Sequence, residues 1–332
     1  MSIPWSTLLS ASSRPILRSE YARGVVYATA AGIALGVLGP VSNLAYAAGM
    51  SSPTFAALRA TIGALVVLLV IFGTRRTLFP LRSLSAQERR LLGLTAVAQA
   101  ALSLSLFAAY GAMAVALVLA VYFSYPLIVS MASIALGRER MTLVRGAALV
   151  TALAGLTAVV LGGGGGVGSL SLAGLLLAGV AATCQATYVV ASRAGFTRVP
   201  SEQATAVILA GGAALMWLVA LPSEMFSGKT AAWIGSPTAW VAIAVAGILG
   251  AALAKVWLLR GVRRVGGTRA SVLMLSEPVT GVVLAAVLLG QGMSMVQVAG
   301  GVAVLAGAML AQRPAGRQGP AAPAPPPHAE TA

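Results

Sequence analysis

The chain has 332 residues, of which 58% are hydrophobic and only 9% are charged, and its formal net charge is +15. Soluble domains carry about 25% charged residues, so this chain lacks the polar surface to cover a water-soluble body of its size. It has no Asp, one His (His328) and one Cys (Cys184), which excludes a disulfide framework and a Cys/His metal site. Its charges lie in short groups between apolar stretches, which argues against a nucleic-acid-binding protein.

A helix that crosses a bilayer needs about 20 apolar residues. The chain contains a series of such windows, and none shows the alternating period of a barrel strand. They predict ten transmembrane helices, at residues 24–46, 53–72, 91–109, 113–136, 143–161, 170–192, 203–221, 238–259, 270–289 and 294–311. The predicted fold class is therefore an all-α integral membrane protein.

Basic residues are concentrated in alternate loops. They lie in the N-terminal segment (residues 1–23), after the second, fourth, sixth and eighth predicted helices, and in the Pro/Ala-rich tail (residues 312–332), whereas the intervening loops hold only Lys229. The positive-inside rule then places both termini in the cytoplasm. The composition of the tail predicts disorder. The predicted location is the cytoplasmic (inner) membrane of a bacterium.

One segment of the chain occurs twice. Residues 125–155 and 277–307 align without a gap, so that Tyr125 matches Glu277. The loop after the fourth predicted helix is basic and its counterpart after the ninth is neutral, while the reverse holds for the loops after the third and the eighth. This exchange is expected when two five-helix units lie in the membrane with opposite orientations. We therefore predict two inverted five-helix repeats, residues 24–162 and 163–311.

Several motifs accompany these repeats. The fourth helix of each contains a proline, Pro126 or Pro278, and the first is followed by the turn GlyArgGluArgMetThr (Gly137–Thr142). With these features the chain resembles the drug/metabolite transporter superfamily, in particular its EamA-type members. The family's turn has glycine directly before glutamate, whereas Arg138 separates them here and the second copy lacks the glutamate. Arg59 fits an arginine that family members often have early in the second helix.

The resemblance implies a ten-helix bundle with a central cavity between the halves. The cavity would be lined mainly by predicted helices 1, 3, 4, 6, 8 and 9. The resemblance also implies export of amino acids or other small metabolites.

Glu277 is the only acidic residue deep within a predicted membrane helix. A carboxylate in lipid is costly, so such a residue faces protein or a watery cavity. Burial favours the protonated form of a carboxyl group. Glu277 is therefore a candidate for proton coupling or for binding a substrate amine. The alternative is a protonated side chain that hydrogen-bonds a neighbouring helix and fixes the proline bend.

The repeat pairs Tyr125 with Glu277 and Tyr122 with Met274. Each pair on one helix is separated by three residues, so its members share a helix face. If the halves meet at a pseudo-two-fold axis, phenols line one wall of the cavity and a carboxyl and a thioether line the other. This suits an amphipathic substrate with an amine. For each tyrosine taken alone, ordinary helix packing is the favoured alternative.

The remaining candidates lie inside other predicted helices. Pro126 and Pro278 each remove a helix hydrogen bond and are predicted helix breaks, which often flank transport sites. Asn43 and Gln185 either bind the substrate or form interhelical hydrogen bonds. Trp257 either lines the cavity wall or anchors the helix at the membrane interface.

Three other polar side chains are expected to be structural. Gln99 is predicted to hydrogen-bond a neighbouring helix. Lys255 and Arg59 lie near the ends of predicted helices, where long basic side chains usually extend to the lipid headgroups. For Arg59, attraction of an anionic substrate at the outer mouth is the alternative.

The fifth and tenth predicted helices carry small residues at four-residue spacing. Such a ridge lets two helices approach closely. It either packs the two halves together or forms the seam of a homodimer. The residues are Ala147, Thr151 and Gly155 in one helix and Ala299, Ala303 and Gly307 in the other.

The sequence thus predicts a secondary active transporter that exports a small metabolite by alternating access, with proton exchange as a driving force. Its expected partners are a small-molecule substrate and the lipid bilayer, with no nucleic acid, metal or cofactor. An enzyme is not expected, because a lipid-modifying transferase would need clustered acids or histidines near one interface. A non-transporting membrane scaffold is the other alternative, but it has no need of two inverted halves.

Overall fold

The computed structural model describes residues 5–75, 77–112, 115–138, 141–162, 171–226, 232–289 and 294–311. The predicted disordered tail and Lys229 lie outside these residues. The first half contains α1 (Trp5–Gly36), α2 (Leu38–Ala47), α3 (Ser52–Gly73), α4 (Ala86–Ala112), α5 (Val115–Tyr122), α6 (Tyr125–Ala135) and α7 (Leu143–Leu161). The second half contains α8 (Leu172–Ala194), α9 (Ser201–Phe226), α10 (Pro237–Val245), the π-helix η3 (Ala246–Leu253), α11 (Ala254–Val265), α12 (Gly267–Leu273), α13 (Ser276–Leu289) and α14 (Met295–Ala311).

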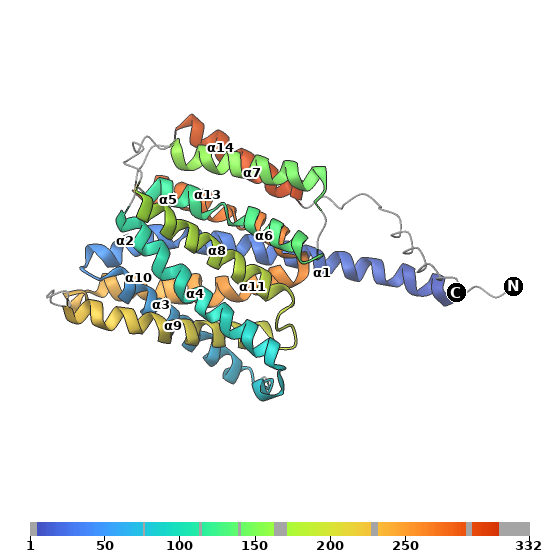
Figure 1. Ribbon diagram of the computed structural model, residues 1–332, viewed down its shortest axis with the longest axis horizontal. Helices are drawn as coiled ribbons and strands as arrows, with labels where there is room; N and C mark the ends of the chain where they lie inside the picture. The colour runs from blue at the N-terminus through green and yellow to red at the C-terminus, as the bar shows by residue number, and fades with distance from the viewer. Residues whose placement is uncertain are drawn as a thin grey trace, which may run out of the picture.

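The described helices run back and forth between the two ends of a bundle (Figure 1). Four stretches are long and apolar enough to cross a membrane, namely Ser52–Gly73, Leu172–Arg193, Ser201–Phe226 and Pro237–Val265. Shorter apolar helices lie at Tyr125–Ala135, Leu143–Val159 and Met295–Leu310. Large apolar side chains such as Leu69 and Leu218 are exposed on the outside of the bundle, as lipid-facing residues would be.

Several of the predicted membrane helices are interrupted. The fourth consists of α5 and α6, and the ninth consists of α12 and α13. The breaks lie at Phe123–Ser124 and at Met274–Leu275, just before Pro126 and Pro278. Each proline therefore occupies the first turn of the following helix, where its missing N–H would have no helical partner.

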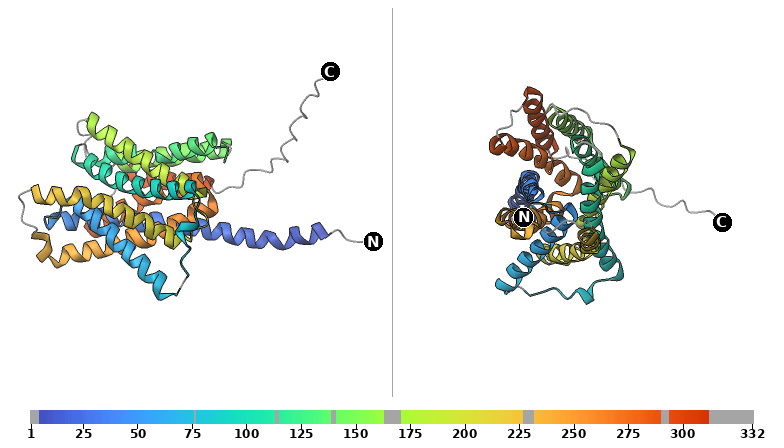
Figure 2. Two further views of the ribbon diagram at one scale, coloured as in Figure 1. Left: turned by 60° about the horizontal axis from the view of Figure 1, so that its bottom comes forward. Right: turned by 90° about the vertical axis from the view of Figure 1, so that its left-hand side faces the viewer.

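Helices α7 and α14 pack against each other with two-fold symmetry. They occupy matching positions of the two repeats and lie side by side along one edge of the bundle (Figures 1 and 2). A Cβ atom added to Gly155 would lie 2.6 Å from the carbonyl oxygen of Gly300, and one added to Gly307 would lie 2.7 Å from that of Ala148. Gly307 and Ala148 are the repeat mates of Gly155 and Gly300. The two contacts are thus exchanged by a local two-fold axis, and the helices run antiparallel.

Other helix pairs follow the same symmetry. Helix α4 packs against α8 and α9, and its counterpart in the second repeat, η3–α11, packs against α1 and α3. Helices α3 and α9, which are counterparts, pack against each other. This pairing is what two inverted repeats require. Of the predicted small-residue ridge, Gly155, Ala303 and Gly307 lie in the contact between α7 and α14, whereas Ala147 and Ala299 are exposed and their neighbours Ala148 and Gly300 make the contact instead. A homodimer through these helices would have to use their outward faces.

Arginine-bearing segments meet at one end of the bundle, on the right in Figure 1. Arg264 of α11 donates to Glu20 of α1 at 2.9 Å, and this hydrogen bond holds the pKa of the Glu20 carboxyl below its usual value. Arg263 donates to the carbonyl oxygens of Phe196 at 3.0 Å and Val199 at 2.8 Å. These bonds tie the ends of α1, α8 and α11 together.

Candidate functional site

Glu277 lies in the first turn of α13, directly after the break that precedes Pro278. Its backbone N–H donates to the carbonyl oxygen of Met274 at 2.9 Å, which closes the turn. Helix α1 passes close by, because a Cβ atom added to Gly36 would lie 2.6 Å from the carbonyl oxygen of Glu277. The Glu277 side chain is partly exposed. A carboxylate in the first turn of a helix also interacts favourably with the helix dipole.

Two buried cations lie within electrostatic range of this carboxyl group. Arg59 of α3 is 8% exposed and Lys255 of α11 is 5% exposed. Both interact with Glu277, and they repel each other. None of the ion pairs within 4.0 Å among the described residues joins any two of these three side chains. The site therefore holds three ionisable groups at longer range rather than a closed salt bridge.

The π-helix η3 brings the two cations together. It ends at Leu253, two residues before Lys255, and it packs against α3. A Cβ atom added to Gly247 of η3 would lie 3.4 Å from the carbonyl oxygen of Arg59, and one added to Gly63 would lie 2.5 Å from the Cβ of Ala251. The glycines thus allow a close approach of the two helices. Short π-helical stretches occur frequently at functional sites.

Aromatic side chains form the other part of the site. The ring centres of Tyr122 and Tyr125 lie 5.7 Å apart, and both side chains are buried. Tyr122 interacts with Arg59, and Tyr125 interacts with Glu277 and with the side chain of Gln185. The Tyr125 hydroxyl also donates to the carbonyl oxygen of Ser271 at 3.4 Å. The phenols of the first repeat and the carboxyl of the second are therefore in one cluster.

Tyr188 of α8 belongs to the same cluster through its contact with Lys255. The Lys255 ammonium lies 4.8 Å from the centre of the Tyr188 ring, within the range of a cation–π interaction. Among the described residues, the Tyr188 hydroxyl, the Gln185 side-chain oxygen and the Arg59 Nε have no hydrogen-bond partner. Buried polar atoms of this kind are expected where a ligand or water binds.

The other predicted residues lie at varying distances from this cluster. Met274 is fully buried, and Trp257 is half-buried against the main hydrophobic core. The side chain of Asn43 lies outside the described part of the structure. Gln99 is buried on α4 and donates to the hydroxyl of Ser103 at 3.3 Å, which is a bond within α4 and not to a neighbouring helix as predicted.

The expectation that Lys255 and Arg59 reach the headgroups is wrong, because both are buried inside the bundle. The sequence pattern ends the eighth membrane helix near residue 259, whereas α11 continues to Val265. The ten residues from Lys255 to Val265 correspond to about 15 Å of helix, so the Lys255 side chain is too short to reach the end of α11. The arginines at 260, 263 and 264, which resemble a loop cluster in the sequence, lie inside α11.

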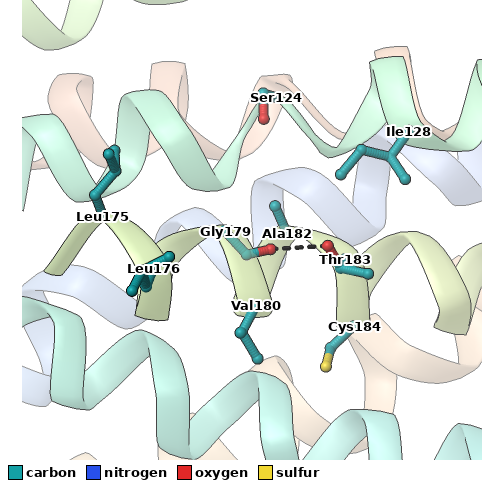
Figure 3. Close-up of a pocket in the computed structure, with 9 residues that line it drawn as sticks. All are labelled: Ser124, Ile128, Leu175, Leu176, Gly179, Val180, Ala182, Thr183 and Cys184. Atoms are coloured by element: carbon teal, nitrogen blue, oxygen red, sulfur yellow. Dashed lines mark hydrogen bonds between the residues drawn. The ribbon is translucent and has the colours of Figure 1, made fainter. Parts of the chain in front are cut away.

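A separate groove of about 490 Å³ lies on the surface of α8 (Figure 3). It contains none of the clustered polar residues. Its side chains are mostly apolar, and the Thr183 hydroxyl donates to the carbonyl oxygen of Gly179 within α8. Leu176 and Val180 are exposed there, as lipid-facing residues would be. The groove is lined by Ser124, Ile128, Leu175, Leu176, Gly179, Val180, Ala182, Thr183 and Cys184.

Comparisons with known proteins agree with this architecture. The model of the EamA-like transporter family matches residues 22–161 and 172–312, one match for each repeat. A crystal structure of a protein is similar over 87% of this chain and 96% of its own, with a TM-score of 0.74 and 23% sequence identity, which shows a shared fold. No curated protein matches the chain.

Proposed function

Because this chain belongs to the EamA-like transporter family, whose members are multi-pass membrane transporters, we propose that it is a secondary active exporter of amino acids or other small metabolites. It works by alternating access, with ten membrane helices and a binding site between the two repeats. The observation that carries this proposal is the cluster in which the partly exposed Glu277 interacts with the buried side chains of Arg59, Lys255 and Tyr125, with Tyr122 beside them.

The place of this cluster supports a transport site. Its residues come from both repeats, and two of its helices are broken next to it, at Phe123–Ser124 and at Met274–Leu275. Broken helices at the interface of inverted repeats often form the binding sites of secondary transporters. Ionisable residues at membrane depth commonly mark substrate or proton pathways. Glu277 is the proposed proton carrier, because it is the carboxyl group of this cluster.

The arginine-rich end of the bundle is the proposed cytoplasmic end. In the conformation described here, Arg264 and Glu20 join α11 of the second repeat to α1 of the first at that end. Opening the site toward the cytoplasm would separate these helices. The bond between Arg264 and Glu20 is therefore a proposed part of the cytoplasmic gate.

The predicted orientation can be tested with reporter fusions. Green fluorescent protein, which is active in the cytoplasm, should fluoresce when the chain is truncated and fused after Gly137, at the end of α6. Alkaline phosphatase, which is active outside, should be active when fused after Leu289, at the end of α13. The two sites are expected to give opposite signals because equivalent loops of inverted repeats emerge on opposite sides. The same signal from both sites would contradict the inverted topology.

Transport itself is tested in proteoliposomes. The purified protein is reconstituted with a pH gradient, and accumulation of labelled amino acids is measured against liposomes without protein. A substrate found in this way should also raise the melting temperature of the protein in detergent, since a ligand that binds only the folded form stabilises it. Absence of gradient-dependent flux for every compound that binds would refute the transport proposal.

A further inference from the structure

Arg59 and Lys255 are two positive charges that the described protein leaves without a full counter-charge. Glu277 supplies one negative charge at most, and it makes no ion pair within 4.0 Å with either cation. Among the described residues, the other groups for which an interaction with these two cations is identified are tyrosines. Arg59 interacts with Tyr46 and Tyr122, and Lys255 lies over the ring of Tyr188.

Phenols and aromatic rings offset only part of the free energy that a buried cation loses when it leaves water. Removing a charge from water is costly unless the charge is paired and hydrogen-bonded. Both cations are more than nine-tenths buried, and the Nε of Arg59 has no hydrogen-bond partner among the described residues. With one carboxyl and two basic groups, the site has a net positive charge whenever Arg59 and Lys255 are both protonated, and in that state it is complementary to an anion.

The two cations also have the right chemistry for one kind of anion. A guanidinium group presents a planar fork of N–H donors that matches a carboxylate with two parallel hydrogen bonds. The ammonium group of Lys255 adds a compact positive charge from the neighbouring helix. Because η3 packs closely on α3 through Gly247 and Gly63, Arg59 and Lys255 lie on neighbouring elements, and the two side chains interact electrostatically.

We propose that Arg59 and Lys255 form a carboxylate-binding subsite, so that the substrate of this transporter is a zwitterion whose carboxylate contacts these two residues and whose ammonium faces Glu277. This inference rests on the proposed function, and it narrows the substrate class. A molecule with an amine but no carboxylate, such as a polyamine or a cationic drug, would leave both cations uncompensated. A carboxylate without an amine would lack the contact to Glu277.

The subsite is tested with matched ligands that differ in one charged group. The melting temperature of the purified full chain is measured with each of the 20 common L-amino acids. For the amino acid that gives the largest shift, the corresponding amine without the carboxylate and the corresponding acid without the amine are measured next. The amino acid should stabilise the protein most, the acid less, and the amine not at all. An amine that stabilises as well as its amino acid, or a panel without any shift, would overturn the proposal.

Variants then assign the subsite to its residues. Arg59→Gln and Lys255→Met should each raise the apparent Kd for the amino acid by roughly 30-fold or more, which is the typical effect of truncating one member of a buried charge pair. Arg90→Gln removes an exposed arginine of α4 and should leave the Kd unchanged. If Arg59→Gln does not fold, Arg59→Lys replaces it in this test. Arg59→Lys keeps the positive charge but loses the paired N–H donors of the guanidinium group. It should weaken binding of the acid and leave the response to the amine unchanged. Unchanged affinity in folded Arg59 and Lys255 variants would also overturn the proposal.

The outcomes separate this inference from the transport proposal. If amines are transported in proteoliposomes and amino acids are not, the protein is a transporter and the carboxylate subsite is wrong. If amino acids bind through Arg59 and Lys255 but no flux is measured, the subsite stands and the transport proposal fails.

Discussion

Replacing Glu277 with Gln is expected to abolish accumulation of substrate driven by a pH gradient, while exchange of substrate across the membrane without a gradient continues. Glutamine has nearly the same shape and can still hydrogen-bond, but it cannot take up or release a proton. One pH unit corresponds to about 1.4 kcal/mol per proton, so a carrier that couples one proton to one substrate can support a roughly tenfold accumulation. We expect the variant to lose this factor entirely in a proteoliposome assay.

A matched control is available in the same chain. Glu88 lies outside the apolar spans, where its carboxyl accepts a hydrogen bond from the backbone N–H of Ser85. Glu88→Gln should therefore keep gradient-driven accumulation at the level of the unmodified protein. If Glu277→Gln also keeps it, while remaining folded, Glu277 is not the proton carrier and its carboxyl has a structural role.

The second large effect is expected at the contact between α7 and α14. Replacing Gly155 with Leu would place a side chain where even a Cβ atom lies 2.6 Å from backbone atoms of α14. Backbone atoms cannot rotate away, so the two helices must separate and lose their packing. Overpacking of this kind typically costs about 1–3 kcal/mol and sometimes more. The melting temperature of Gly155→Leu in detergent should fall clearly, and so should that of Gly307→Leu, because the two positions are equivalent.

Gly146 provides the control for this prediction. It lies on the same helix, but a Cβ atom added there would meet nothing within 4 Å. Gly146→Leu makes the same chemical change at a position with open space for the side chain and should leave the melting temperature nearly unchanged. A Gly155→Leu protein as stable as Gly146→Leu would contradict the antiparallel packing of α7 and α14 described here.

Much of this fold could be predicted from one sequence, because lipid restricts a spanning chain to a few solutions. Each predicted membrane helix falls on one described helix or on consecutive ones. The breaks before Pro126 and Pro278 follow from proline geometry. The break between α1 and α2 has the same origin, since Pro40 cannot donate a helical hydrogen bond to Gly36, the last residue of α1. The π-helix η3 could not be predicted, because hydrophobic periodicity does not distinguish it from an α-helix in an apolar stretch.

The candidate site is only partly predictable from the sequence, because helix ends and close helix contacts decide which polar side chains are buried. The repeat alignment placed Tyr125 and Glu277 at equivalent positions, and the structure has both in one cluster. The sequence places Lys255 near the headgroups because the arginines at 260, 263 and 264 resemble the basic loop that follows a membrane helix. They lie within α11, and the end of that helix at Val265 depends on Gly266, whose φ of 91° is readily adopted only by glycine. Burial of Arg59 likewise depends on glycines in η3, far away in the sequence.

The two-fold contact of α7 with α14 has the form of an isologous dimer interface, here contained in a single polypeptide. In a dimer of identical subunits every substitution appears twice, so a carboxyl introduced on one side of the central axis would face a second carboxyl on the other. Two acidic groups in one buried space repel each other and oppose each other's ionisation. Linking the copies covalently removes this restriction, since each half can then mutate alone. The acid at 277, where the first repeat has the phenol at 125, is an asymmetry that a dimer of identical subunits could not acquire.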